Sequence, residues 1–457
     1  MMKPHYHEPA KEIPVYGEYD VIVAGGGTAG ALSAISAART GAKTLVLERL
    51  DCLGGMLTAG MMSLTWCLND MEKIVVRGIA LEIFDKLKER NATMKCDMEK
   101  EAFVIYDAEQ AKKVIGDLAA AEPNLEVLYY SWVADTIMEG NRVAGIVMEN
   151  KSGRQAVYGK CVIDATGDAD VCVFAGAECR TAPAQNSHPA TLIAKVGGVD
   201  VEKLRAYYKE HPDQLGSFCG RWEYSPFHTY RLDKELAGKA LPQRLEYLRD
   251  WFIIFHETVR ENEIMLNMTG DTAVDGTNAL QITGAENLSR TRIEECLEVF
   301  RMYMPGCENC YLITTASTLG IRESRQVVGR YTITREDLVT ARAFPDTVCR
   351  GSSLIGSHSP DGRNSAFVTL NPGNSFSLPY RCMIPAKVRG LLVTGRCISV
   401  EHDAMGGTRI MPVCMGLGQA AGTAAALCAR HSIDPADVSI PELQKALLDQ
   451  GAYLGER

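Results

Sequence analysis

The sequence predicts an α/β fold in which one domain, formed by two separate stretches of chain, is interrupted by an inserted α+β domain. Two observations predict this arrangement. A strand, a glycine loop, a helix and a second strand follow one another within 18–48, and a strand with a small-residue helix resumes the same style beyond residue 381. The residues between them have helical stretches and loops rich in Tyr, Trp and His. We therefore expect a first domain over 1–180 and 381–457 and an inserted substrate or cap domain over 181–380.

Composition excludes several classes of protein. The chain has 457 residues, too many for one simple core, and is 46% hydrophobic and 23% charged, which is typical of globular proteins. A net charge of −9 argues against a nucleic-acid partner. No apolar run approaches the roughly 18 residues that span a bilayer, and the polar N-terminus does not resemble a signal peptide. Fifteen scattered cysteines fit free thiols in a reducing compartment, so we expect a cytoplasmic protein.

The first elements form a compact βαβ pattern. Tyr19–Ala24 is a short β-branched strand that glycines follow at once. Small residues at helical spacing predict a helix from Gly30 to Thr40, with Gly41 ending it. Lys43–Leu47 then reads as a second buried strand.

The loop between strand and helix matches G-x-G-x-x-G, a dinucleotide-binding turn. Gly25 permits the tight turn, Gly27 lets the backbone approach a pyrophosphate, and Gly30 allows the helix to pack closely. The helix N-terminus offers N–H groups to the phosphates. Glu48 ends the next strand, where a carboxylate can bind ribose hydroxyls. We expect nucleotide contacts from Gly25, Gly27, Thr28, Ala29, Gly30, Glu48 and Arg49.

The elements that follow alternate between helices and strands. Helical patterns lie near Gly78–Arg90 and Asp107–Ala121. Between Leu125 and Asp164, turn signals divide the chain into a β-meander. A strand-like Gly390–Thr394 and a small-residue helix from about Pro412 to Arg430 then resume the first style.

Three further segments favour FAD over NAD. Gly54-Gly55-Met56 is placed to run a second loop under the pyrophosphate, and 164–168 is placed as a sharp turn beside the adenosine half. Gly395-Arg396 precedes a loop at 404–408 and a helix beginning near Met411, whose positive end would face the flavin. The sequence has no second G-x-G-x-x-G motif, so we do not expect a separate NAD(P)H domain. The further cofactor contacts that we expect are Gly54, Gly55, Met56, Thr58, Val133, Ala165, Thr166, Gly167, Asp168, Gly395, Arg396, Gly407, Thr408 and Met411.

Five stretches of the chain resemble a known family. They are DVIVAGGGTAG, LGGMLTAG, DATGDADV, GIRESRQVVGRYTITREDL and LPYRCMIPAKVRGLLVTGRCISVEHDAMGGTRIMPVCMGLGQAAGTAAAL. Over roughly 18–430 the sequence is similar to the FAD-dependent oxidoreductase family, within the fumarate-reductase and glutathione-reductase-like flavoproteins. The resemblance implies a Rossmann-like FAD-binding domain of the glutathione-reductase type, non-covalent FAD and redox chemistry. It does not imply one substrate.

Missing motifs narrow the chemistry. No Cys-x₄-Cys follows Gly54-Gly55, which argues against dithiol reductase chemistry, and Cys307-x₂-Cys310 is interpreted as two unpaired loop thiols. No histidine lies near Gly54–Thr65, where relatives with a covalent flavin attach it, so we expect non-covalent binding. Gly395 is followed by Arg396 and not by the aspartate of the aromatic hydroxylases.

Two clusters are candidates for the chemical centre. In Arg322-Glu323-Ser324-Arg325, a guanidinium can clamp a carboxylate. For Glu323, a structural ion pair with an arginine that joins the two domains is slightly preferred over catalysis. The second cluster is Glu401-His402 with Arg409. The intrinsic pKa of a histidine suits proton transfer at neutral pH, and the alternative is that His402 is only a hydrogen-bonding spacer. Arg409 lies two residues before the predicted helix. The catalytic candidates are Arg322, Glu323, Arg325, His402 and Arg409.

Several other residues have a structural explanation that is preferred. Gly418 and Gly422 lie at i, i+4, where they let the last helix pack tightly on the first. His5 and His7 lie in the N-terminal tail, where a histidine pair usually binds nothing. The polar aromatic residues Trp66, His228, Tyr230, His358 and Tyr380 are individually more typical of packing or surface than of catalysis.

These observations predict an FAD-dependent dehydrogenase or reductase that transfers a hydride between flavin N5 and a small organic substrate. The substrate bond is either C–C/C=C or alcohol/ketone, for example in a sugar or cyclic alcohol. A flavoprotein subunit that passes electrons to a partner protein is the alternative class. The sequence leaves a homo-oligomer open and favours neither a nucleic-acid partner nor a membrane span.

Overall fold

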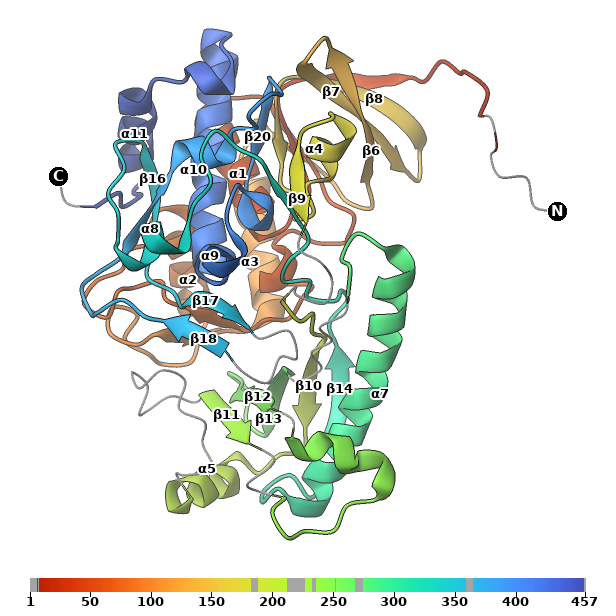
Figure 1. Cartoon of the computed structure of the whole chain (residues 1–457), viewed down its shortest axis with the longest axis vertical. Coiled ribbons are helices and arrows are strands. Elements are labelled where there is room, and N and C mark those ends of the chain that lie inside the picture. The colour runs from red at the N-terminus through yellow and green to blue at the C-terminus, as the bar shows by residue number, and fades with distance from the viewer. Residues whose placement is uncertain are drawn as a thin grey trace.

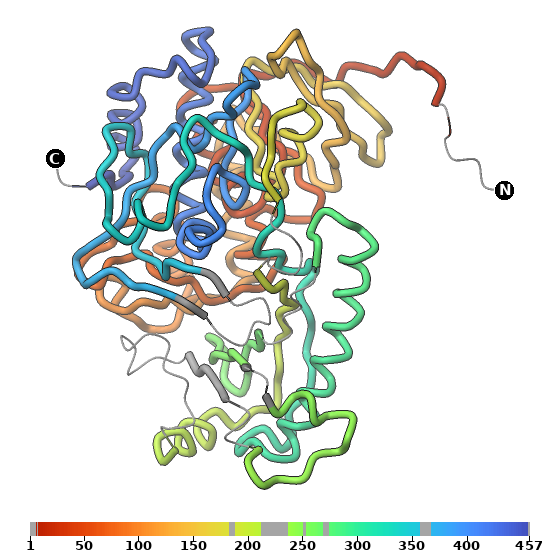
Figure 2. Tube along the Cα trace, viewed as in Figure 1, coloured from red at the N-terminus to blue at the C-terminus, as the bar shows by residue number. Residues whose placement is uncertain are grey.

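The computed structural model describes residue 6 and residues 8–181, 188–211, 227–231, 236–250, 252–267, 274–358 and 365–455. Figure 1 shows a larger body, which contains the central sheet and the helices α1 and α10, above a smaller one built around β10, β14 and α7. The chain crosses from the larger body into the smaller one and later returns, as the colours in Figure 2 show.

The central sheet is the Rossmann-like part of the fold. Its strands lie in the order β5-β2-β1-β8-β7-β6, and β20 also pairs with β8. The strands β5, β2, β1, β8 and β20 are parallel, whereas β6, β7 and β8 form the antiparallel meander that the sequence predicts. The bounds are β1 Val15–Ala24, β2 Thr44–Leu47, β5 Leu125–Leu128, β6 Trp132–Glu139, β7 Arg142–Asn150, β8 Gly153–Asp164 and β20 Leu391–Val393.

Successive side chains of β1 join different apolar clusters, so the core of the larger body has one layer on each face of the central sheet. Val21 and Val23 join the apolar cluster that contains the helices, whereas Ile22 and Ala24 join the cluster beside the β6–β8 meander. Successive strand side chains point to opposite faces, and both faces are covered here. A run of consecutive apolar residues is therefore the expected sequence of this strand.

Helices α1 (Thr28–Arg39) and α10 (Met411–His431) pack on each other through backbone contacts. A Cβ on Gly418 would lie 2.2 Å from the Ala29 oxygen, and one on Gly422 would lie 2.1 Å from the Ser33 oxygen. The Ser33 hydroxyl also donates to the Gly418 oxygen at 3.0 Å. The predicted role of these glycines is confirmed.

Helix α10 contradicts the expectation that no apolar run in the sequence approaches the length that spans a bilayer. In the described part of the chain it is the one helix long and apolar enough to cross a membrane, with a mean hydropathy of 1.3 over 18 residues, of which 94% are buried inside the structure. Because α10 contains many alanines and glycines, the apolar run was not recognised in the sequence. Burial against α1 is a sufficient reason for its composition.

The remaining elements of the larger body surround this core. The predicted helices near Gly78–Arg90 and Asp107–Ala121 are confirmed as α2 and α3, and the Asp107 carboxylate caps α3 by accepting from two backbone N–H groups. The bounds are β3 Leu64–Trp66, α2 Ile79–Glu89, β4 Phe103–Ile105, α3 Ala108–Ala120, α4 Asp170–Phe174, β9 Cys179–Thr181, α9 His402–Thr408 and α11 Ile440–Asp449. Short 3-10 turns occupy Gly55–Leu57, Tyr380–Met383, Gly395–Cys397 and Pro435–Asp437.

The smaller body has an antiparallel sheet and its own core. The strand order is β11-β12-β13-β10-β14, and residues of the long helix α7 belong to the same apolar cluster as the sheet. This is the α+β insert that the sequence predicts. The bounds are β10 Ile193–Gly197, α5 Val201–Glu210, β11 Phe227–Arg231, β12 Phe252–Glu257, β13 Glu263–Asn267, α7 Ala279–Tyr303 and β14 Tyr311–Thr315, with a 3-10 turn at Gln243–Asp250.

The apolar clusters divide the chain differently from the expected boundary at residue 380. The cluster of the insert ends at Leu319, whereas Ile333, Leu338 and Leu378 belong to the core of α1 and α10. The segment consists of short pieces without dinucleotide signals, so the sequence did not reveal its packing partner. These pieces are β15 Arg325–Val327, α8 Arg335–Val339, β16 Thr347–Gly351, β17 Ile355–His358, β18 Ser365–Val368 and β19 Phe376–Pro379.

Candidate active site

The glycine loop between β1 and α1 leaves open space where the sequence predicts a pyrophosphate. A Cβ on Gly27 would meet nothing within 4 Å. By contrast, a Cβ on Gly30 would lie 1.8 Å from the Gly25 oxygen, and Gly25 itself has φ +95°. Gly25 and Gly30 thus shape the turn, and Gly27 leaves room for a ligand. Phosphates bind in such positions at a helix N-terminus.

The second glycine loop packs directly on the first. The Gly54 N–H donates to the Gly26 oxygen at 2.8 Å, and the Thr28 hydroxyl donates to the Gly54 oxygen at 2.8 Å. Gly55 has φ +55°, and a Cβ there would lie 2.9 Å from the Gly27 Cα atom. The two loops therefore form one surface, as the spacing of the motifs predicts. Met56 and Thr58 continue this second loop.

Glu48 lies at the end of β2 and holds the first glycine loop in place. Its side chain accepts hydrogen bonds from Gly26 N–H at 2.8 Å and from Leu50 N–H at 2.9 Å. The residue is 5% exposed, and burial raises the pKa of the carboxyl. Contact of Glu48 with a ribose stays a prediction. The next residue, Arg49, lies over the Trp132 ring at 5.3 Å, beside Val133 in β6.

The turn after β8 is held by the carboxylates of the buried Asp164 and the half-buried Asp168. Asp164 accepts hydrogen bonds from the Thr166 backbone and hydroxyl and from the Cys172 N–H. Asp168 lies 2.9 Å from Arg396 Nη2 and accepts from the Ser324 hydroxyl at 2.6 Å. The predicted cofactor segments 164–168 and 395–396 are therefore in contact with each other.

Several predicted cofactor residues lie around the starts of α1 and α10. A Cβ on Gly395 would lie 3.0 Å from the Ala29 Cβ atom, so the loop after β20 touches the start of α1. Gly407 and Thr408 are buried at the end of α9, and Met411 begins α10 after an extended Ile410. Ala165 and Gly167 belong to the turn after β8, where Gly167 has φ +81° and a Cβ there would lie 2.9 Å from Arg396.

Arg322 and Arg409 form a pair of partly buried cations. Burial and the neighbouring charge of Arg409 lower the pKa of Arg322 to about 9. Burial likewise lowers the pKa of Arg409 to about 10. Arg322 Nη1 donates to the Pro189 oxygen, whereas Arg409 Nε has no hydrogen-bond partner among the described residues. We call these two residues the arginine pair.

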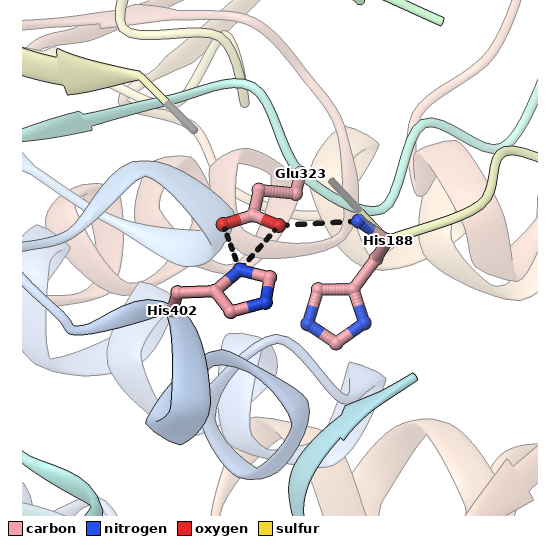
Figure 3. Close-up of side chains that lie close together, drawn as sticks. All are labelled: His188, Glu323 and His402. Atoms are coloured by element: carbon pink, nitrogen blue, oxygen red, sulfur yellow. Dashed lines mark hydrogen bonds and ion pairs between the residues drawn. The ribbon is translucent and has the colours of Figure 1, made fainter. Parts of the chain in front are cut away.

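Glu323, His402 and His188 come together from three separate segments (Figure 3). His402 Nδ1 lies 2.9 Å from both Glu323 oxygens, and the His188 backbone N–H donates to the same carboxylate at 3.2 Å. The two imidazole rings lie side by side with their centroids 5.1 Å apart. The hydrogen bond to Glu323 raises the pKa of His402. The carboxylate side chain is 0% exposed.

His188 was not predicted from the sequence, and Arg325 has a different environment from the other candidates. His188 begins the described segment 188–211 and belongs to no recognised motif. Its neighbour Pro189 accepts from Arg322, and this contact, which the sequence does not reveal, links the segment to the GIRESR stretch. Arg325 Nη1 lies 3.4 Å from Asp170 of α4, beside the turn after β8. Burial and two neighbouring carboxylates raise the pKa of Asp170 to about 6.

The remaining candidates have structural environments or lie outside the described atoms. Trp66 packs edge-on against Phe103 at 5.1 Å, and the buried Tyr380 donates to the Pro435 oxygen at 2.9 Å. Cys307 and Cys310 are buried in the core of the insert, where burial raises the pKa of both thiols. The side chains of His228, Tyr230 and His358, and all of His5 and His7, lie outside the described residues.

A cavity of about 200 Å³ lies between the two bodies. Its lining includes Met61 and Tyr106 from the larger body and Lys195 and Arg260 from the insert. Neither the arginine pair nor the Glu323 carboxylate lines it. We therefore do not assign the chemistry to this cavity.

Comparison with protein families identifies the class of protein. The family model described as FAD dependent oxidoreductase matches residues 20–447. The chain belongs to this family. FAD is therefore the cofactor of the chain, and its class is oxidoreductase. The open space at Gly27, the paired glycine loops and the buried Glu48 fit the phosphate and adenosine parts of FAD.

Two curated relatives of this FAD dependent oxidoreductase match only part of the chain. Thiamine thiazole synthase of Saccharolobus islandicus strain L.S.2.15 is 32% identical over 165 residues, or 34% of this chain and 57% of the relative. The protein of the same name from Sulfolobus acidocaldarius is 31% identical over 35% of this chain and 59% of its own. The chain thus matches less than two thirds of the length of these relatives.

Solved structures are similar over more of the chain but at lower identity. A geranylgeranyl bacteriochlorophyll reductase-like protein of Thermoplasma acidophilum is 17% identical, with 96% of this chain and 84% of that chain covered and a TM-score of 0.49. THI4 of Thermovibrio ammonificans is 23% identical over 35% of this chain and 64% of its own, with a TM-score of 0.29. Both TM-scores are below 0.5.

Proposed function

We propose that this FAD-dependent oxidoreductase acts on a small organic acid. The observation that supports this proposal is the arginine pair: two partly buried guanidinium groups lie close enough for one to lower the pKa of the other. Burying two neighbouring cations costs free energy, and the Glu323 carboxylate near Arg409 offsets that cost only in part. A bound carboxylate would remove that cost for both residues, because a guanidinium can donate two parallel hydrogen bonds to it.

The proposed orientation of the substrate follows from the position of the free donor. Arg409 Nε has no acceptor among the described residues, whereas Arg322 already donates to the Pro189 oxygen. Arg409 is therefore proposed as the main carboxylate ligand, with Arg322 held beside it. Fixing the acid at one end positions its reacting carbon, which is a large part of what an enzyme contributes to such reactions.

The Glu323–His402 pair is proposed to handle the proton. FAD, when bound, supplies the group that accepts or donates a hydride at flavin N5. A hydride transfer to or from carbon is accompanied by a proton, and an imidazole is the usual residue that holds it. The carboxylate of Glu323 fixes the orientation of the His402 ring. The substrate bond is then C–C/C=C in an enoate or alcohol/ketone in a hydroxy acid.

We test this proposal by changing Arg409. Oxidised and reduced protein are mixed anaerobically with saturated acids, hydroxy acids, enoates and 2-oxo acids, and the flavin spectrum is followed in single turnover. With the fastest acid we expect Arg409→Ala to retain FAD and to react about 100-fold more slowly, a loss of about 3 kcal/mol. Arg409→Lys keeps the positive charge but loses the planar group that can donate two parallel hydrogen bonds. Its rate is expected to lie between those of wild type and Arg409→Ala.

The matched control is Arg342→Ala. Arg342 is 59% exposed and pairs with Asp337 at 3.0 Å in a different part of the larger body. This variant should react at the wild-type rate. If Arg409→Ala also reacts at the wild-type rate, the carboxylate is not bound by the arginine pair and the proposal is wrong.

The cellular setting rests on the sequence. We propose a cytoplasmic protein on the evidence of its scattered cysteines, of which the fourteen in the described residues form no disulfide. An electron-transfer partner and a homo-oligomer remain predictions. The single-turnover experiment tests the prediction of an electron-transfer partner, because a subunit that only relays electrons would not react with any small acid on its own.

A further inference from the structure

We propose that His188, Glu323 and His402 bind a divalent transition-metal cation. The three side chains offer one ligand atom each, and these atoms all lie within 4.8 Å of one another. Two imidazoles and one carboxylate form a ligand set that binds iron(II) or zinc and leaves further coordination positions open. The proposal concerns the same region as the arginine pair but does not depend on the substrate being an acid.

The distances are close to those of a metal site. With metal–ligand bonds of about 2.1 Å, ligand atoms lie about 3 Å apart when adjacent and about 4 Å apart when opposite. His402 Nδ1 and the Glu323 oxygens already lie 2.9 Å apart. The ligand atom of His188 lies within 4.8 Å of the other two, so it has to approach them by at most about 1–2 Å to complete three ligands.

The surroundings of the carboxylate suit a ligand. Glu323 is buried, and the His188 backbone N–H donates to Oε2 at 3.2 Å. Ligating carboxylates are commonly held by such a second hydrogen bond, which fixes their direction. Figure 3 shows the carboxylate above the two rings, with both imidazoles approaching from the same side. A cation bound to both side chains replaces the hydrogen bond between Glu323 and His402.

The arginine pair limits the affinity. Arg409 is close enough to Glu323 for the carboxylate to favour its charged form, so a cation at Glu323 is repelled by Arg409. A dicarboxylate bound at the arginine pair would cancel this repulsion. Because coupling between two ligands is reciprocal, we expect succinate to tighten metal binding.

The experiment measures binding of Zn²⁺ to the FAD-loaded protein after dialysis against a chelator. Titration calorimetry is carried out on wild type, His188→Ala and Glu323→Gln, with flavin absorbance and thermal unfolding as checks of folding. We expect one zinc site in wild type that weakens about 100-fold or more in each variant. His188→Ala removes the ring but keeps the backbone N–H that holds Glu323, so its fold should be retained.

The control is the exposed pair of His431 and Glu442, which also lie 2.9 Å apart. His431→Gln should leave zinc binding unchanged, because a single histidine and a single glutamate do not form this site. Zinc bound equally by wild type and His188→Ala, or no zinc bound at all, would overturn the proposal. A zinc affinity that succinate leaves unchanged would count against acid binding at the arginine pair, and the loss of zinc binding in His188→Ala would still support the metal site.

Discussion

Glu323 and His402 are 79 positions apart in the chain, and both were predicted as candidates for the chemical centre. Their residue types indicated the chemistry, and the structure adds that they are hydrogen-bonded to each other. This contact was not predictable, because it depends on how the loop before β15 meets the start of α9. His188 was missed for a related reason: a histidine outside any motif gives no signal until the fold brings it beside the others.

At the scale of single residues, Gly27 offers the sharpest test of the cofactor site. Gly27 has φ −62°, which any residue can adopt, and a Cβ there meets nothing within 4 Å. Gly27→Val should therefore fold normally and lose FAD, because the new side chain fills the space for the phosphates. Flavin absorbance of the purified protein, together with thermal unfolding of the apoprotein, measures both effects.

The control for this prediction is Gly116→Val in α3, where a Cβ also meets nothing within 4 Å. It should retain FAD at the wild-type level. A Gly27→Val protein that is purified with a full complement of flavin would show that the phosphates do not approach this glycine.

At the scale of elements, the sequence predicted the βαβ unit, the meander and the closing helix because each has a strong local pattern. The contact between α1 and α10 was predictable from two glycines at helical spacing. The segment between the insert and residue 380 was assigned to the insert, because its short strands and turns have no periodic pattern. Its position depends on long-range packing of Ile333, Leu338 and Leu378 with the first domain.

The contact between these two helices gives a prediction about stability. Gly422→Ala places a Cβ 2.1 Å from the Ser33 oxygen, which is backbone and cannot rotate away. We expect a loss of roughly 1–3 kcal/mol in the free energy of unfolding, because the helices must separate slightly. Denaturant unfolding of the FAD-loaded protein measures it.

A glycine in another helix provides the opposite expectation. A Cβ on Gly284 in α7 meets nothing within 4 Å, so Gly284→Ala should stabilise the protein by up to about 1 kcal/mol through helix propensity. If both variants change stability in the same direction, close packing is not what Gly422 provides.

At the scale of the whole molecule, two bodies meet around residues from several distant segments. The larger body supplies the glycine loops, His402 and Arg409, while Arg322 and Glu323 lie just after the last residue of the insert core, Leu319. This placement connects the insert to the chemical centre through one short stretch of chain. It also explains why the cofactor site was largely predictable from local motifs while the chemical centre was not.

The most direct test of the central claim compares an acid with its neutral amide on the isolated protein. Purified FAD-loaded protein, without any partner, is mixed anaerobically with its fastest acid and with the carboxamide of the same carbon skeleton, and the flavin spectrum is recorded over a single turnover. We predict that the acid changes the flavin redox state at least about tenfold faster than the amide, because only the acid meets the arginine pair. Equal rates for the two compounds, or no reaction with any small acid, would contradict the account.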